Sequence, residues 1–563
     1  AYRHHVHDAL FPRAYAPGCV DAPLDSAGTD GLACARSDSL LLLIREEAQA
    51  PIDDSILAAV DYARQEGWNI AWWPDSDSDS ISADSSEARR VFRMPIPTGY
   101  RCRPELFHTM LEAAEDDSVL VYADHDHADV DGERSDPELK PAWNPELLLN
   151  RNYVLFPWMA SDDWVRRVEG PAATRRQRHE LILLAASLGI SISRSAVNDL
   201  DEPLAGRSSD DDVIPPLRDQ QVARVPQILA TCLRYQGATS PGIADGEDPW
   251  QQRVAEALSR AGSKASVEKG PGERVSHVIW PLPENLPAVD IIIPTRDKVE
   301  VLQTCIESVL AKTNYPNYRI LLVDNDSAET RTKDYYRTLA RESRIELLRF
   351  AGPFNYSAIN NHAAQQGDSP LLLLLNNDTE VISETWLEEM VRQAMRPDIG
   401  CVGAKLHYTN GRIQHAGVIV GINGVAGHAH RYSPSHAAGY CQRLICSQNL
   451  TAVTAACLAI RRATFEQVGG LDQQELGIAW NDVDLCLKVQ REGYRNLWTP
   501  HARLFHHEGL SRGADDTRSQ VRRVDAERQV MMQRWTLQNF SDPAYHPLLA
   551  RDNESFWLGK TVN

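Results

Sequence analysis

The chain has 563 residues, too many for one hydrophobic core, so we expect two or three domains. The apolar fraction of 43% is typical of a soluble globular protein. The formal net charge of −20, from 78 acidic and 58 basic residues, repels nucleic acid and provides no general attraction to anionic lipid. We therefore expect no nucleic-acid partner and at most peripheral membrane contact.

No apolar run approaches the ~20 residues that a transmembrane helix needs, and the first residues lack the apolar core of a signal peptide. The ten cysteines are scattered along the chain, and none forms a CxxC pair. This usage predicts reduced thiols in a cytoplasm and no structural zinc.

The first half of the chain is predicted to contain one α/β unit. Residues 1–37 lack periodicity and are interpreted as a lead-in segment, whereas strand and helix patterns alternate over residues 38–201. Residues 202–286 are interpreted as a linker with packing helices, predicted over Val222–Tyr235 and Trp250–Ala261.

A second domain is predicted over residues 287–545, followed by a C-terminal tail over residues 546–563. It opens with the buried strand V-D-I-I-I-P-T-R-D, Val289–Asp297, and a helix then leads to a second strand, Tyr318–Asp324. A further helix and strand precede the leucine strand that starts at Leu371, so the pattern is β-α-β-α-β. Such a series predicts a mostly parallel sheet with helices on both faces.

The stretch L-L-L-L-L-N-N-D-T-E, Leu371–Glu380, suits a strand buried on both faces that ends in polar residues. Ligands of open α/β sheets bind beyond the carboxyl ends of the strands, so Asn376, Asn377 and Asp378 should project into a site that Asp324 also faces. A carboxylate beside neutral oxygen ligands suits Mg²⁺ or Mn²⁺ holding a diphosphate. A plain Asn/Asp-rich turn is the alternative.

From Val289 to about Phe540 the sequence resembles the nucleotide-sugar glycosyltransferases of family 2, which have the GT-A fold. The matching motifs occur in the family's order: I-I-I-P-T-R-D, L-L-V-D-N-D-S, F-N-Y-S-A-I-N-N, L-L-N-N-D-T-E, G-G-L-D, W-N-D-V-D-L-C-L and H-H-E-G-L-S-R-G. The closest resemblance is to bacterial enzymes that extend O-antigen, capsule or similar surface polysaccharides, including rhamnosyltransferases. The resemblance implies a Rossmann-like GT-A catalytic domain.

The nucleotide side of the predicted site centres on Asp324. A carboxylate there can accept the N3–H of uracil or thymine, whereas cytosine presents an acceptor at that position, and the resemblance implies the same role. The other expected nucleotide-binding residues are Pro294, Thr295, Arg296, Asn325, Asn361 and Asn377. Pro294 could serve only to end its strand, and Asn361, near a helix start, could equally be structural.

The resemblance also implies a metal and diphosphate site. Asp378 matches the last carboxylate of the family's DxD motif, although Asn376 stands at the first acidic position and an amide oxygen coordinates less strongly. His506 matches the histidine that completes the site, with the adjacent His507 as the alternative. Arg512 could neutralise the leaving diphosphate, because a guanidinium presents paired donors to phosphate oxygens.

An inverting transfer needs a base on the face opposite the departing diphosphate. Asp482, in W-N-D-V-D-L, aligns with the catalytic base of the family's E-D motif, although Asn481 stands where glutamate is usual. Asp484 lies two residues further on and cannot share a helix face with Asp482, so a structural role is expected for it.

The first domain carries a segment, from about residue 119, that resembles the later part of a second family 2 domain. Its run Asp124-His125-Asp126 suggests a metal site. The strand that should carry the donor-metal carboxylate is replaced, however, by R-M-P-I-P-T-G-Y-R-C, which has no carboxylate. We expect a smaller, shortened, catalytically silent GT-A-like domain.

These observations favour a metal-dependent, inverting glycosyltransferase that uses a UDP- or dTDP-sugar and a lipid-linked glycan acceptor. Such an enzyme is expected in the cytoplasm, with at most peripheral contact at the inner face of the plasma membrane. A non-catalytic glycan- or nucleotide-binding scaffold is the alternative from another class, and donor hydrolysis discriminates the two. A nucleotidyltransferase is a third reading, but the first strand is not followed by a glycine-rich phosphate loop.

Overall fold

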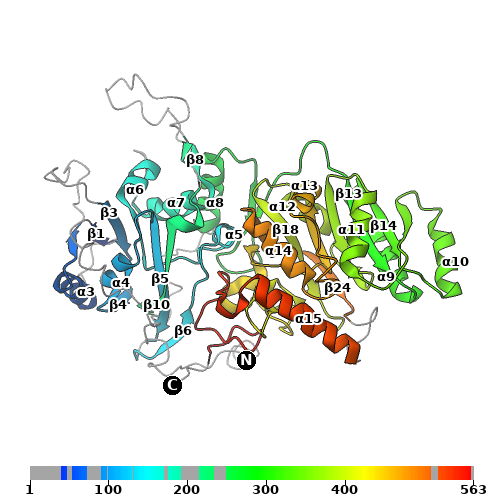
Figure 1. Ribbon diagram of the computed structural model, residues 1–563. Helices are drawn as coiled ribbons and strands as arrows, with labels where there is room; N and C mark the ends of the chain where they lie inside the picture. Colours follow the sequence, from blue (N-terminus) through cyan, green and yellow to red (C-terminus); the bar gives the residue numbers. More distant parts are fainter. Residues whose placement is uncertain are drawn as a thin grey trace.

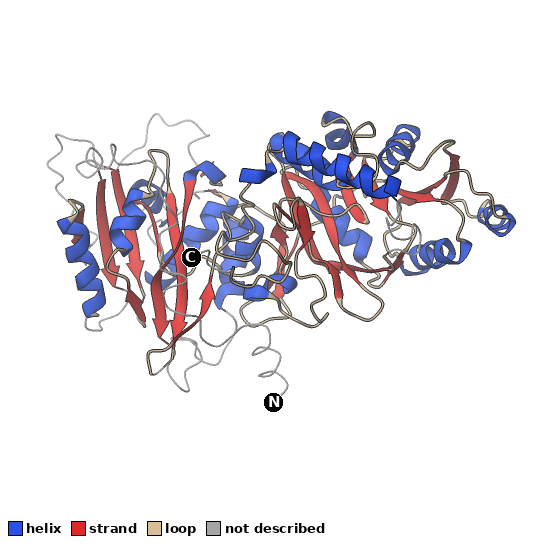
Figure 2. Ribbon diagram, turned by 60° about the horizontal axis from the view of Figure 1, so that its bottom comes forward, coloured by secondary structure: helices blue, strands red, loops and turns tan. Residues whose placement is uncertain are grey.

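The computed structural model describes residues 40–46, 53–72, 90–97, 99–129, 131–169, 175–191, 213–214, 216–233, 249–508 and 518–559. The described residues form two α/β units, each built on one large sheet, that lie side by side (Figure 1). Helices lie on both sides of each sheet (Figure 2). The predicted lead-in over residues 1–37 lies outside the described residues.

The first sheet has eight strands in the order β2-β1-β3-β7-β5-β10-β4, with β6 paired to β5. Its strands are β1 Leu40–Glu46, β2 Asn69–Trp72, β3 Arg90–Ile96, β4 Tyr100–Cys102, β5 Leu120–Ala128, β6 Arg134–Glu138, β7 Trp158–Ser161 and β10 Val222–Leu233. The helices are α3 Asp54–Gln65, α4 Leu106–Glu112, α5 Pro145–Asn150, α6 Asp162–Glu169, α7 Arg175–Leu188 and α8 Pro249–Arg260. The hairpin of β11 Ser266–Lys269 and β12 Ser276–Ile279 follows α8, and the short strands β8 Ile190–Ser191 and β9 Val213–Ile214 form a separate pair.

The helix predicted over Val222–Tyr235 is wrong, because this segment forms strand β10. It pairs in parallel with β5 and antiparallel with β4, and its register shifts between Val225 and Ile228. Pro226 lies at that shift, where its missing N–H is tolerated, whereas a proline inside a helix would cost about 3 kcal/mol. The first sheet therefore extends into the region that the sequence suggested was a linker.

The second sheet has ten strands in the order β15-β14-β13-β16-β23-β18-β24-β17, with β19 paired to β18 and β22 to β24. Its strands are β13 Val289–Thr295, β14 Tyr318–Asp324, β15 Ile345–Arg349, β16 Leu371–Leu375, β17 Thr379–Val381, β18 Ile399–His407, β19 Ile413–His415, β22 Gln448–Asn449, β23 Cys457–Arg461 and β24 Arg495–His506. The helices are α9 Val299–Lys312, α10 Thr330–Leu339, α11 Tyr356–Gln366, α12 Trp386–Ala394, α13 Arg462–Gln467, α14 Asn481–Arg491 and α15 Arg518–Arg534. The sheet is parallel from β15 to β16 and mixed beyond, where β23 runs antiparallel to β16.

The leucine strand β16 lies at the centre of this sheet, as its sequence predicts. Its five leucines are at most 1% exposed and alternate between two hydrophobic clusters, one on each face of the sheet. Both faces are covered, so an unbroken apolar run is stable there and every second leucine packs on the same side. The polar residues after Leu375 are the first that the chain can place outside the core.

The two sheets share one topology. Strands β2, β1, β3, β7, β5, β10 and β4 have the same order, and the same parallel or antiparallel sense, as β14, β13, β16, β23, β18, β24 and β17. The hairpin strands β6 and β19 also correspond, whereas β15 and β22 have no counterpart in the first sheet among the described residues. The predicted architecture of two GT-A-like units in tandem, the first one smaller, agrees with this repetition.

Contacts between segments far apart in sequence join the two units. Asn144 Nδ2 donates to the backbone carbonyl of Asn449 at 2.8 Å, and the backbone N–H of Asn449 donates to Asn144 Oδ1 at 2.9 Å. His546, in the C-terminal segment, is buried against Asp124 of the first sheet, with 2.7 Å between Nε2 and Oδ2. The C-terminal segment thus packs against both units.

None of the helices in the described part of the chain combines the length and apolarity needed to cross a bilayer.

Candidate active site

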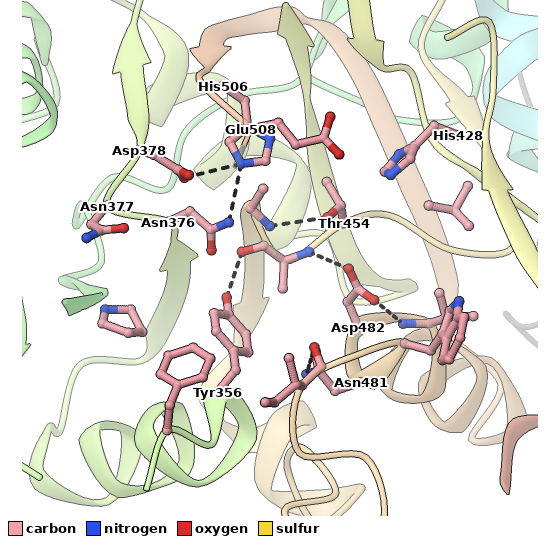
Figure 3. A pocket seen from close by; sticks show the side chains of 18 of the residues that line it. Tyr356, Asn376, Asn377, Asp378, His428, Thr454, Asn481, Asp482, His506 and Glu508 are labelled. Carbon is pink, nitrogen blue, oxygen red and sulfur yellow. Dashed lines mark hydrogen bonds and ion pairs between the residues drawn. The ribbon is translucent and has the colours of Figure 1, made fainter. Parts of the chain in front are cut away.

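A cavity of about 960 Å³ opens beyond the carboxyl ends of β13 and β16 in the second unit. Its walls come from the ends of these strands, the end of β24, the start of α14, β21 (Ala426–His428) and α15. Figure 3 shows Asp378 and His506 on one wall and Asp482 on the other, with Tyr356 between them at the base of the view. The position agrees with the rule that ligands of open α/β sheets bind beyond the carboxyl ends of the strands.

The turn between β16 and β17 holds the first group of polar side chains. Asp378 Oδ1 lies 3.3 Å from His506 Nε2, and Asn376 Nδ2 lies 3.4 Å from the same nitrogen (Figure 3). The antiparallel pairing of β17 with β24 sets Thr379 opposite His506 and thereby brings the turn against the end of β24. Carboxylate, imidazole and amide groups therefore converge on one wall of the cavity.

Strand alternation determines which of the two adjacent histidines, His506 or His507, faces the cavity. Successive side chains of a strand point to opposite faces, so His506 faces the cavity and His507 does not. His507 Nε2 instead lies 3.6 Å from Glu380 Oε2, and its amide donates to the carbonyl of Asp378 at 2.9 Å. Arg512 lies outside the described residues.

The predicted nucleotide-binding residues divide into two groups. Pro294, Thr295, Arg296 and Asn377 line the cavity, and Asn377 Nδ2 donates to Thr295 Oγ1 at 3.1 Å. Asp324 does not line the cavity; it lies directly opposite Thr295 in the parallel β13–β14 pair. Asp324 and Thr295 thus end neighbouring strands at the same edge of the sheet.

The carboxylate of Asp324 is held by its own loop. Oδ1 accepts from the amide of Ser327 at 3.0 Å and from the hydroxyl of Tyr336 at 3.1 Å. The other oxygen, Oδ2, has no hydrogen-bond partner among the described residues. The arrangement orients the side chain and leaves one oxygen available to an additional donor.

The two asparagines Asn325 and Asn361 lie outside the cavity and bond within the fold. Asn325 is buried, and its Nδ2 donates to the carbonyls of Phe350 and Gly352 at 3.1 and 3.0 Å. Asn361 exchanges two hydrogen bonds with the backbone of Leu471, at 2.8 and 3.0 Å. Both amides connect loops around the site and would not be free to turn toward a nucleotide without breaking these bonds.

Asp482 lies in the first turn of α14, on the wall opposite Asp378. Its Oδ2 accepts from the amide of Ala455 at 3.0 Å, and its Oδ1 accepts from the amide of Val483 at 2.9 Å. Burial raises the pKa of Asp482, although hydrogen bonds from these backbone amides and from Thr454 lower it in part. The side chain is therefore a better proton acceptor than an ordinary aspartate once it is ionised.

The neighbours of Asp482 in the motif have different surroundings. The preceding Trp480 has a left-handed backbone, with φ of 52°, which turns the chain sharply into α14. Asp484 is fully buried, and its Oδ1 accepts from Arg534 Nη1 at 2.9 Å and from Trp535 Nε1 at 3.0 Å. It joins α14 to the end of α15, in agreement with the structural role expected from the sequence.

The wall of the cavity that carries Glu508 contains side chains that were not among the predicted site residues. Glu508 lines the cavity and pairs with Arg431 at 2.9 Å, while the hydroxyl of Tyr408 donates to its Oε2 at 2.8 Å. Burial raises the pKa of Glu508, but Tyr408 and Arg431 outweigh it, so the net shift is downward. Glu508 could have been predicted from the sequence, because side chains alternate along an extended segment: His506 and Glu508 face the cavity and His507, between them, does not. The other unpredicted lining side chains include Tyr356, Thr454, Gln520 and Arg523.

The shared topology shows what occupies the corresponding positions of the first unit. The connection from β3 to β4 carries Pro97 and Gly99 where the connection from β16 to β17 carries Asn376 and Asp378. On β10, Cys232 pairs with Tyr100 in the way that His506 on β24 pairs with Thr379. At these positions the described residues of the first unit therefore include no counterpart of Asp378 or His506.

The second unit has the mostly parallel β15-β14-β13-β16 sheet half that the predicted GT-A fold requires, and its cavity lies beyond the carboxyl ends of β13 and β16. Residues 290–469 match the family model described as glycosyl transferase family 2. Residues 290–469 therefore form a glycosyltransferase family 2 domain, and the family and fold expected from the motifs are confirmed for this part of the chain.

Relatives cover most of this chain. An uncharacterized protein, y4gI of Sinorhizobium fredii, is 40% identical over 79% of this chain and 46% of its own length. The O-antigen biosynthesis protein RfbC of Myxococcus xanthus is 34% identical over 71% of this chain and 29% of its own. The chain thus spans less than half the length of these two relatives.

Shorter and more distant similarities were also found. The N-acetylglucosaminyl-diphospho-decaprenol L-rhamnosyltransferase of Mycobacterium tuberculosis is 35% identical over 11% of this chain and 20% of its own length. A solved mannosyltransferase of Pyrobaculum calidifontis, in complex with GDP-Man and Mn2+, is 15% identical, covers 50% of this chain and 71% of its own, and has a TM-score of 0.35.

Proposed function

We propose that this chain is a metal-dependent, inverting glycosyltransferase that moves a sugar from a UDP- or dTDP-linked donor to a growing bacterial surface glycan. The observation that carries the proposal is one cavity with Asp378 and His506 on one wall and Asp482 on the other. A leaving-group site and a base on opposite sides of a sugar are what in-line displacement at the anomeric carbon requires.

The nucleotide would bind beyond β13 and β14. Thr295 and Arg296 line the cavity, and Asp324 lies next to Thr295 on the neighbouring strand. The unpaired Oδ2 of Asp324 would accept the N3–H that uracil and thymine share and cytosine lacks. Asn325 and Asn361 would support this wall through their bonds to neighbouring loops.

Asp378 and His506 would hold the donor's divalent ion, with Asn376 as a weaker neighbour. The ligand types fit, because carboxylate oxygen suits Mg²⁺ and Mn²⁺ alike, and an imidazole nitrogen favours the transition metal Mn²⁺. When bound there, the ion would neutralise the diphosphate and make it a better leaving group. Buried on the wall of a cavity, the carboxylate attracts a cation more strongly than it would in bulk water.

Asp482 would take the proton of the acceptor hydroxyl as the new glycosidic bond forms. The amides of Ala455 and Val483 fix its two oxygens, so the carboxylate is oriented before the acceptor arrives. Its raised pKa increases its strength as a base. Glu508 and Arg431 would contribute to the wall against which the acceptor sugar packs.

The acceptor proposed is a lipid-linked glycan, met at the inner face of the plasma membrane by an otherwise cytoplasmic enzyme. The similarity to an O-antigen biosynthesis protein and the match to a rhamnosyltransferase support this class of acceptor. For the first unit we propose a non-catalytic role in architecture or acceptor docking, since Gly99 and Cys232 replace the donor-site aspartate and histidine.

The decisive experiment screens UDP-, dTDP- and GDP-sugars with Mn²⁺, using both thermal stabilisation and donor hydrolysis. A bound ligand raises the melting temperature by mass action, so the correct donor should raise Tm and be hydrolysed slowly. Stabilisation by a nucleotide sugar with no hydrolysis or transfer in any condition would instead favour the non-catalytic scaffold. If no UDP- or dTDP-sugar has an effect, the proposed donor class is wrong.

A further inference from the structure

Two histidines and a glutamate converge in the first sheet, in the unit without the donor-site aspartate. His125 and His127 lie two residues apart on β5 and therefore project from the same face, and β6 places Glu138 opposite His125. One ligand atom from each of the three lies within 4.8 Å of the others. His127 Nε2 is 3.6 Å from Glu138 Oε1, and the two imidazole centroids are 5.4 Å apart.

The environment of His125 is unusual for a histidine that serves only to fill the core. It is fully buried, and neither Nδ1 nor Nε2 has a hydrogen-bond partner among the described residues. An unsatisfied buried polar group costs roughly 1–3 kcal/mol, so native proteins rarely keep one without a use.

The other two side chains of the cluster are partly exposed to solvent, and one of them, Glu138, is held in a fixed orientation. His127 is 15% exposed and Glu138 is 18% exposed, so an ion can enter from solvent. Arg151 Nη2 contacts both oxygens of Glu138, at 3.1 and 3.2 Å, and fixes the carboxylate beside the imidazoles. A positioned carboxylate with two neutral imidazoles is a set that binds zinc with a fourth position open to water.

We propose that His125, His127 and Glu138 bind a divalent transition-metal ion of the zinc type, at a site separate from the proposed donor cavity. The cysteine spacing, from which no structural zinc was expected, does not bear on histidine ligands. The cluster lies beside Cys232, the counterpart of His506, so it lies where the first unit would otherwise have its own donor site.

A metal ion bound by this cluster would also stabilise the contact between the two units. Strand β6 continues into Leu139, whose amide donates to the hydroxyl of Tyr440 at 2.8 Å, and that hydroxyl donates to the carbonyl of Pro137 at 2.8 Å. Tyr440 belongs to the second unit. An ion that clamps β6 to β5 therefore also stabilises the contact between the two units.

The test uses the full chain, with any affinity tag removed, in an Asp378→Asn, His506→Gln background so that the proposed donor-metal site cannot bind the probe. Equilibrium dialysis against Zn²⁺ alone should give one ion per chain. Adding His125→Gln or His127→Gln should lower the affinity by more than about tenfold, since loss of even a supporting residue costs 10- to 100-fold. Zn²⁺ should raise Tm in the background and not in these variants.

The matched control is His436→Gln, an exposed histidine outside the cluster, which should leave zinc binding unchanged. Circular dichroism and Tm in EDTA verify folding, and His127→Gln, at the partly exposed position, serves if His125→Gln does not fold. A background protein that binds no Zn²⁺, or one whose affinity survives both histidine substitutions, would overturn the proposal. Because the donor site is disabled throughout, neither result depends on the proposed transferase activity.

Discussion

Asp378 Oδ1 lies 3.3 Å from His506 Nε2, although more than a hundred residues separate them in the chain. The contact exists because β17, which begins directly after Asp378, pairs antiparallel with the end of β24. The same pairing turns the neighbouring His507 away, toward Glu380. Two adjacent histidines of identical chemistry are therefore placed in different environments by strand alternation.

The first prediction separates these two histidines. His506→Ala should lower the apparent affinity for Mn²⁺ in the transfer reaction by about 10- to 100-fold or more, because it removes a proposed direct ligand of the ion. His507→Ala should have little effect. Metal titrations of initial rates measure both variants, and EDTA should abolish transfer by the unmodified protein. Equal losses in the two variants, or full activity in EDTA, would contradict the proposed metal site.

The second prediction concerns Asp482. Substituting asparagine removes the base but keeps a side chain of the same size, so donor affinity should change little while kcat falls by about 10²- to 10⁴-fold. Calorimetry with the donor and single-turnover rates distinguish binding from chemistry. A fall in kcat of less than tenfold with unchanged donor binding would place the base elsewhere.

The pH dependence provides a third prediction. Asp482 acts as a base only when ionised, and burial raises its pKa, so the acidic limb of kcat should lie at higher pH than an ordinary aspartate would give. Transfer is lost as the pH falls through this raised pKa. The stability effect has the opposite sign, because a raised folded-state pKa contributes stability at low pH that is lost as the pH rises through it. An acidic limb that is unchanged in Asp482→Asn would exclude this assignment.

The fourth prediction tests the structural role of Asp484. Asp484→Ala leaves Arg534 and Trp535 without their buried acceptor and should lower the free energy of unfolding by about 1–3 kcal/mol. Glu475→Ala is the matched control, because Glu475 also pairs with Arg534 but is 59% exposed and should contribute about 0–1 kcal/mol. Urea unfolding measures both. Similar losses from the two substitutions would mean that burial of Asp484 is unimportant.

The fifth prediction concerns the first unit. Asp124 is buried against His546, and Asp126 pairs with Arg134 at 2.5 Å, so both carboxylates have partners within the fold. Asp124→Ala combined with Asp126→Ala should lower Tm but leave the linkage of the product unchanged. Product analysis by NMR checks this outcome. Loss of one of two distinct linkages would show that the first unit is itself an enzyme.

The sequence by itself determined the elements whose signals are local. An unbroken run of five leucines can be stable only between two apolar layers, so it predicted β16, and its polar end predicted where Asp378 would lie. The position of Asp482 at the start of α14 followed in the same way from a motif and a helix pattern. The order of these motifs was enough to identify the family of the second unit.

Only the tertiary structure decided what depends on pairing between distant segments. Val222–Leu233 has a sequence compatible with a helix, yet it forms a strand because β5 and β4 satisfy its backbone hydrogen bonds. The pairing of β24 with β17 selected His506, and loop contacts directed Asn325 and Asn361 away from the cavity. Hydrogen bonds and burial between residues remote in the chain fix these outcomes, and a local pattern does not contain them.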